Sequence, residues 1–150
     1  VLGALEYAQA LGALTIGVAC NVPSPVVSRA QIGIGVTVGP EVLTGSTRLK
    51  SGTAQKMVLN MLSTGAMVRL GKVYGNLMVD VQITNDKLSA RARRIVAKVA
   101  SISEERAASL LHLSGGNAKT AIVMAVKGVE VDEARHLLDL NSGRLREIIG

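Results

Sequence analysis

The chain has 150 residues, a formal net charge of +6 and 48% hydrophobic residues, and it contains two Tyr and no Phe or Trp. This length suits one domain with a buried core, which Leu, Val, Ile, Met and Ala must supply because large aromatic side chains are nearly absent. The apolar stretches are too short to span a membrane. Cys20 is the single cysteine, so an internal disulfide is excluded, and we interpret Cys20 as a buried residue in a reducing compartment.

The first forty residues predict a helix followed by two strands of a parallel sheet. A helix over residues 1–11 ends at Gly12. Residues 14–20 form a continuous apolar run, which is typical of a central parallel strand with both faces covered. A short helical turn over residues 26–30 leads to a second strand over residues 31–38, where apolar side chains alternate. This order of elements indicates an α/β fold.

Residues 39–56, GPEVLTGSTRLKSGTAQK, connect the second strand to a long predicted helix. We expect this helix to begin near Thr44 and to place Ser46 and Lys50 on one face, with Arg48 on a different side. The start of a helix offers unpaired N–H groups and the positive end of the peptide dipoles, which suits a phosphate. The stretch therefore favours a bound phosphorylated small molecule, and a plain capped helix without a ligand is the equal alternative.

The long helix is expected to continue to Leu70 with one apolar side. We interpret that side as core or subunit contact, in preference to a flexible groove for a partner. Residues 71–80 then cross to the next helix, which Asn85 or Thr84 can cap near Asp86. The residues predicted to supply the apolar side are Met57, Val58, Met61, Leu62, Met67 and Val68.

The helix predicted after Asp86 is amphipathic and basic. Four cations lie on one side of it, and aliphatic side chains lie on the other. No aromatic platform accompanies these cations for stacking bases, so a solvated basic face is favoured and no nucleic-acid partner is expected. The four cations are Lys87, Arg91, Arg94 and Lys98.

The last third reads as a run of short helices. Ser103 caps the first of them, and Gly115 and Gly116 separate it from a helix over residues 118–127. A third helix follows over residues 131–140, and Ser142 is expected to cap a short final one. The apolar side of the first helix is predicted to contain Leu110, Leu111 and Leu113. No metal site is expected, because His112 and His136 have no cysteine or second histidine nearby in the sequence.

The amino-acid sequence of residues 39–56 closely resembles the signature shared by bacterial N-acetylmuramic acid 6-phosphate etherases and the glucokinase regulatory protein. The resemblance continues through NMLSTGAM at residues 60–67 and GKVYGNLMVDV at residues 71–81, where it is closer to the etherases. It covers essentially the whole chain. It implies the C-terminal part of a doubly wound parallel sheet of the sugar isomerase (SIS) type over residues 1–84. A small all-α tail, similar to a ubiquitin-associated (UBA) fold, is implied over residues 85–150.

The resemblance implies a lyase that cleaves the D-lactyl ether of N-acetylmuramic acid 6-phosphate, giving N-acetylglucosamine 6-phosphate and D-lactate in cell-wall recycling. It also implies a cytoplasmic homodimer that uses no cofactor. We expect the chain to be the C-terminal half of a longer protein, with the catalytic glutamates upstream and no catalytic residue in these 150 residues. The alternative is a non-catalytic phosphosugar-binding regulator similar to the glucokinase regulatory protein. The substrate-binding candidates are Glu41, Gly45, Ser46, Thr47, Arg48 and Lys50.

Overall fold

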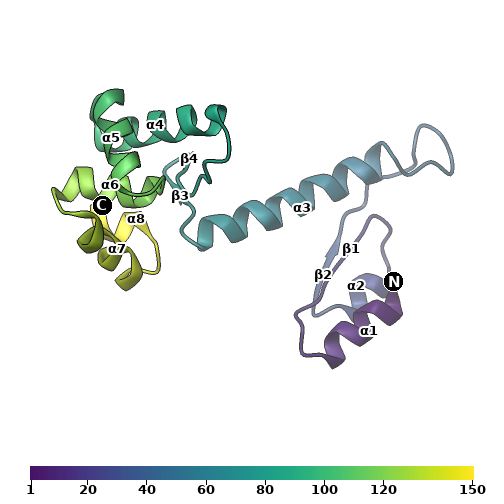
Figure 1. Ribbon diagram of the computed structural model, residues 1–150. Coiled ribbons are helices and arrows are strands. Elements are labelled where there is room, and N and C mark those ends of the chain that lie inside the picture. Colours follow the sequence, from purple (N-terminus) through teal and green to yellow (C-terminus); the bar gives the residue numbers. More distant parts are fainter. The chain divides into compact units, whose positions relative to one another are not determined.

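The computed structural model describes all residues 1–150, and the chain divides into two compact units, Val1–Ser63 and Thr64–Gly150. The first unit contains α1 (Leu2–Ala10), β1 (Ile16–Ala19), α2 (Pro25–Arg29) and β2 (Ile32–Gly35). The two strands pair in parallel, with Ile16 opposite Ile32 (Figure 1). The predicted mixed α/β character and the parallel pairing of these strands are confirmed.

Helix α2 lies close on the small sheet because both strands contain glycine beneath it. A Cβ atom on Gly17 would collide with the carbonyl group of Val26, and one on Gly33 would collide with that of Val27. Glycine is therefore required at these two positions for the helix to approach the strands. Side chains alternate between the faces of a strand. Ile16 and Ile32 consequently belong to the opposite face, where they are 37% and 44% exposed.

Helix α3 (Lys50–Arg69) follows β2 after an irregular segment. The predicted start near Thr44 is wrong, because the chain makes turns through Gly45 and Thr47 and becomes helical only at Lys50. The predicted apolar side is also not buried within this chain: of its six members, Val58 alone is buried. Met57, Met61, Leu62, Met67 and Val68 are exposed.

In the second unit, the end of α3 is followed by a short hairpin that the sequence interpretation missed. Residues 71–80 were expected only to cross over, but β3 (Val73–Tyr74) and β4 (Leu77–Met78) pair antiparallel across a tight turn. Gly75 in that turn has φ +57°, a conformation that glycine adopts without steric cost. The backbone N–H of Val79 donates to the carbonyl oxygen of Lys72 at 3.1 Å, which extends the pairing by one step.

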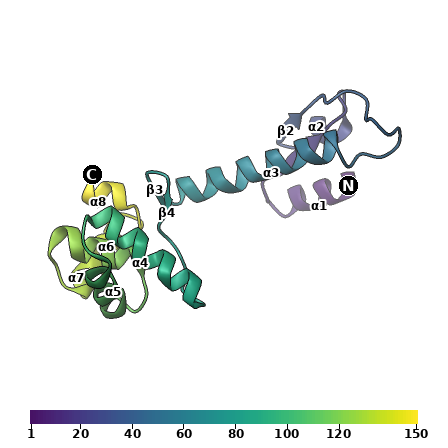
Figure 2. The same cartoon turned by 90° about the horizontal axis from the view of Figure 1, so that it is seen from above.

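The remaining helices are α4 (Asp86–Ala100), α5 (Glu104–Leu113), α6 (Ala118–Lys127), α7 (Val131–Leu140) and α8 (Leu145–Ile149). Helix α6 is the central element, in contact with each of the other four (Figure 1 and Figure 2). It follows that α6 is buried on most of its surface. The largest fully buried side chains of the unit are Ile122, Leu145, Val79, Val96, Val123 and Thr120.

Side-chain caps begin three of these helices, α4, α5 and α6. The side chain of Asn85 accepts a hydrogen bond from the N–H of Leu88 at 3.0 Å, and that of Ser103 accepts one from Arg106 at 3.2 Å, as predicted. Ser142 is not a cap: it has φ +52°, and α8 begins only at Leu145 without a side-chain cap. Each cap fixes a helix start within the second unit.

Two further expectations concern the faces of α4 and α5. Helix α4 is amphipathic as predicted, with Ala92, Ile95 and Val96 buried and its four cations exposed. Leu113 of α5 was expected on the apolar side with Leu110 and Leu111, but it is 58% exposed whereas those two residues are buried. None of the eight helices is long and apolar enough to span a membrane.

Candidate functional site

The segment predicted to bind a phosphorylated ligand lies between β2 and α3 in the first unit. Glu41 stands near its beginning, and its two carboxylate oxygens accept hydrogen bonds from the first two backbone N–H groups of α3. Oε2 accepts from Lys50 and Oε1 accepts from Ser51, each at 3.0 Å. The Lys50 ammonium group donates in return to the carbonyl oxygen of Pro40 at 2.8 Å. We call these three hydrogen bonds the clasp.

The clasp explains why α3 begins at Lys50. The first N–H groups of a helix have no partner inside the helix, and a carboxylate is the strongest acceptor that the chain can supply there. The hydrogen bond from the backbone N–H of Ser51, and to a smaller extent that from Lys50, holds the pKa of the Glu41 carboxyl below its ordinary value of 4.5. Glu41 is therefore ionised at neutral pH and occupies the position where the sequence interpretation expected a phosphate.

The other predicted site residues lie on the loop that the clasp closes. Gly45 has φ +85°, and the N–H of Ser46 donates to the carbonyl oxygen of Leu43 at 3.1 Å, which makes a turn. Ser46 is half-buried, whereas Thr47 and Arg48 are exposed. Because the helix starts later than predicted, Ser46 and Lys50 do not share a helix face. The structure nevertheless brings all six substrate-binding candidates together within one loop and the first residue of α3.

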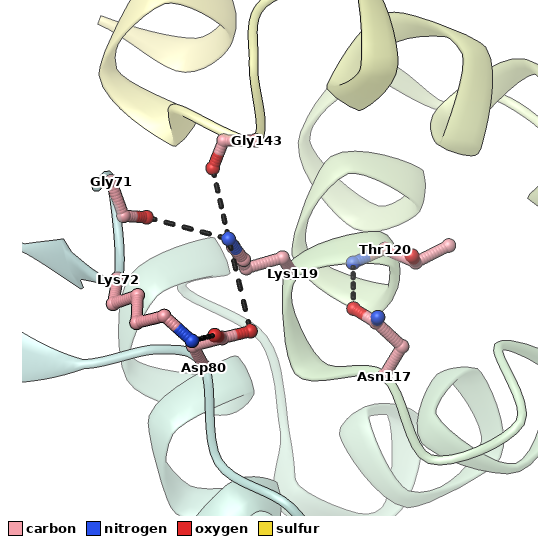
Figure 3. Close-up of polar contacts among 7 residues, drawn as sticks. All are labelled: Gly71, Lys72, Asp80, Asn117, Lys119, Thr120 and Gly143. Carbon is pink, nitrogen blue, oxygen red and sulfur yellow. Dashed lines mark hydrogen bonds and ion pairs between the residues drawn. The ribbon is translucent and has the colours of Figure 1, made fainter. Parts of the chain in front are cut away.

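A second polar cluster lies in the second unit, and the sequence interpretation missed it (Figure 3). Lys119 in the first turn of α6 has a side chain only 12% exposed. Its ammonium group donates to the carbonyl oxygens of Gly143 at 3.0 Å and Gly71 at 3.4 Å, and it lies 3.8 Å from Oδ1 of Asp80. Asp80 also accepts a hydrogen bond from the Lys72 ammonium group at 2.6 Å. The cluster joins α6, the hairpin segment and the turn before α8.

The elements around this cluster explain its geometry. Asn117 caps α6 by accepting a hydrogen bond from Thr120 at 3.0 Å, which fixes where the helix starts and hence where Lys119 lies. A lysine in the first turn faces the positive end of the helix dipole, which disfavours it electrostatically. That unfavourable position is the one sequence signal that Lys119 has a specific partner. Its partner Asp80 is too far away in the sequence for the pairing to be read from spacing.

The cations around Asp80 lower the pKa of its carboxyl from the ordinary value of 3.8. The hydrogen bond from Lys72 is the main cause, and attraction by Lys119 adds to it against the opposing effect of burial. Stability contributed by ionised Asp80 is therefore fully present above about pH 4 and is lost as the pH falls through the lowered pKa of the folded state. An open cavity of about 530 Å³ adjoins the cluster and is lined by Asn117, Lys119 and Arg135, among others.

Comparisons with known proteins find two similarities. Residues 75–114 match the family described as the C-terminal lid domain of glucokinase regulatory protein. The chain is 57% identical over 146 residues to N-acetylmuramic acid 6-phosphate etherase 2 of Vibrio cholerae, covering 97% of this chain and 48% of that protein. It is 53% identical over 149 residues to the N-acetylmuramic acid 6-phosphate etherase of Clostridium beijerinckii, covering 99% and 49%. The chain is therefore similar over nearly its whole length to proteins named N-acetylmuramic acid 6-phosphate etherase.

The N-acetylmuramic acid 6-phosphate etherase of Yersinia pestis is 55% identical over 146 residues, covering 97% of this chain and 50% of that protein. The chain thus spans about half the length of the curated relatives it matches. The family resemblance carried by residues 39–56 and 60–81 is confirmed by these matches. The chain also contains no group of three or more His, Cys, Asp or Glu side chains placed to hold a metal ion.

Proposed function

We propose that the protein is an N-acetylmuramic acid 6-phosphate etherase, a carbon–oxygen lyase that releases D-lactate and N-acetylglucosamine 6-phosphate in the cytoplasm during cell-wall recycling. The observation that carries this proposal is the identity of 53–57% over 97–99% of the chain to proteins of that name. We further propose that this chain supplies phosphosugar-binding residues, and that the catalytic glutamates lie in the part of the longer relatives that it does not match. No metal or redox cofactor is invoked.

We propose that residues 1–84 are part of a doubly wound parallel sheet of the sugar isomerase type. The exposed isoleucine face of β1 and β2 supports this, because parallel sheets are normally covered on both faces. Residues 85–150 are proposed to form a separate helical domain similar to a ubiquitin-associated fold. Its support is the set of short helices packed around α6.

The test of the proposed activity is turnover. The full-length etherase, comprising this chain and the additional part found in its relatives, should release D-lactate from N-acetylmuramic acid 6-phosphate. The 150-residue chain alone should not, because the acid–base groups are proposed to lie elsewhere. Lactate is quantified for both proteins with a coupled dehydrogenase assay. Turnover by the 150-residue chain would place the catalytic groups within it and contradict this division of roles.

A regulator that binds a phosphosugar without cleaving it is the second candidate. The match of residues 75–114 to the lid domain of glucokinase regulatory protein favours it. The same assay separates the two candidates, because a regulator would bind N-acetylmuramic acid 6-phosphate in calorimetry and release no lactate. The higher coverage of this chain by etherases is why we prefer the enzyme.

We also propose that the etherase is a homodimer in which α3 contributes to the subunit contact. Met57 and Met61, one turn apart on α3, are 54% and 63% exposed and form an apolar surface of the kind that subunit contacts bury. Met61→Glu should convert the dimer to a monomer, because it places a charge on that surface. Gln55→Glu is the matched control, since it adds the same charge to the same helix at an exposed polar residue. Sedimentation velocity gives the masses, and a monomeric wild type would contradict the proposal.

A further inference from the structure

The loop of residues 42–49 is closed at its base from both sides. The clasp joins Pro40 and Glu41 to Lys50 and Ser51 through three hydrogen bonds of 2.8–3.0 Å. Two of them use the carboxylate of Glu41, and the third uses the ammonium group of Lys50, so each side of the base contributes a charged group. Compact surface loops with adjoining ends are often functional, and charge-assisted hydrogen bonds are the strong ones with which to close them.

Within the loop, the exposed polar side chains belong to residues between the two ends. Thr44, Thr47 and Arg48 are exposed, and Arg48 takes part in none of the five ion pairs of the chain. Two hydroxyls and a guanidinium group can donate hydrogen bonds to the phosphate and hydroxyl oxygens of a phosphosugar. The helix-start N–H groups of Lys50 and Ser51, by contrast, are already bonded to Glu41. A ligand at this loop would therefore be bound by the loop side chains rather than by the backbone N–H groups at the start of α3.

We propose that Glu41 is a positioning residue: its carboxylate closes residues 42–49 into the conformation that binds the phosphosugar. The inference rests on the proposed function and assigns Glu41 a role within it. Direct acid–base work by Glu41 is disfavoured, because both carboxylate oxygens accept backbone N–H groups and its lowered pKa makes it a weak base. Loss of Glu41 should therefore affect binding more than the chemical step.

The test is Glu41→Gln in the full-length etherase. Glutamine has the same shape, but it has one acceptor oxygen and places an NH₂ group against one of the two N–H donors. If the closed loop falls to about a tenth of the population, KM for N-acetylmuramic acid 6-phosphate should rise about tenfold, with kcat within about threefold of wild type. Amide-proton exchange measured by NMR should show loss of protection at Lys50 and Ser51 in the variant. Glu133→Gln, at an exposed residue of α7, is the matched control and should change neither constant.

Several outcomes would overturn the inference. A fall in kcat at unchanged KM would mean that Glu41 acts on the reacting atoms, and unchanged constants would mean that the loop does not depend on it. Unchanged exchange protection at Lys50 and Ser51 would show that the clasp is not formed by Glu41. If wild type releases no lactate, the proposed function fails separately. Calorimetry with the phosphosugar then decides the inference, which requires that wild type binds and that Glu41→Gln binds about tenfold more weakly.

Discussion

Replacing Lys50 with methionine in the full-length protein should weaken its proposed binding of N-acetylmuramic acid 6-phosphate by about ten- to a hundredfold. Loss of one charge-assisted hydrogen bond to an anion costs on the order of 1.5–3 kcal/mol. Lys50 is exposed at the first residue of α3, and one N–H of its ammonium group is bonded to Pro40, which leaves two for a phosphate. Calorimetry at protein concentrations that keep the proposed dimer assembled provides the measurement.

Arg48→Met is the comparison variant, because Arg48 belongs to the same loop and is also exposed. If Arg48 pairs across the subunit contact, its loss should lower dimer stability first, and affinity should fall only as the dimer dissociates. If it contacts the sugar phosphate, affinity should fall in the assembled dimer as well. If the Lys50→Met variant binds the phosphosugar as tightly as wild type under these conditions, the proposed contact between Lys50 and the phosphosugar is contradicted.

Lys50 also belongs to the clasp, so its two roles must be separated. If Lys50 acts only by closing the loop, the effects of Lys50→Met and Glu41→Gln on affinity should not add in the double variant. If Lys50 contacts the phosphate directly, the double variant should bind more weakly than either single variant. A double-mutant cycle measures this difference, because residues of one network show an interaction energy and independent residues do not.

Replacing Lys119 with methionine should lower the free energy of unfolding of the helical unit by about 1.5–3 kcal/mol. The side chain is 12% exposed, and methionine cannot donate to the carbonyl oxygens of Gly143 and Gly71 or attract Asp80. Asp80 keeps its hydrogen bond to Lys72, which limits the loss. Urea unfolding of the 150-residue chain, followed by circular dichroism, gives the free energy.

Lys127→Met is the matched control for Lys119, because Lys127 is exposed near the other end of the same helix. Its replacement should cost less than about 1 kcal/mol, the scale of an exposed charge at a helix terminus. If Lys119→Met unfolds at the same urea concentration as wild type, the polar cluster around Asp80 does not fasten the hairpin segment to α6. Equal losses for both variants would likewise argue against a specific role.

Local patterns in the sequence were enough to predict most elements of this chain. The apolar runs of residues 14–20 and 31–38 indicated the parallel strands, and Asn85 and Ser103 marked helix starts, because capping and periodicity act between residues a few positions apart. The wording of residues 39–56 indicated the family, which the relatives confirm. The hairpin of β3 and β4 was missed although Gly75 and Asn76 form a common turn pair, because its strands are only two residues long.

Tertiary structure decided the features that depend on partners distant in sequence. Helix propensity could not place the start of α3, because Glu41, nine residues before Lys50, supplies the carboxylate that ends the loop. Spacing could not reveal the cluster of Lys119, Asp80 and Gly143 either, since folding alone brings these segments together. Five of the six residues predicted to form an apolar side of α3 are exposed, because burial depends on neighbouring elements rather than on the helix itself. Periodicity determines which side chains share a face, and packing determines what that face meets.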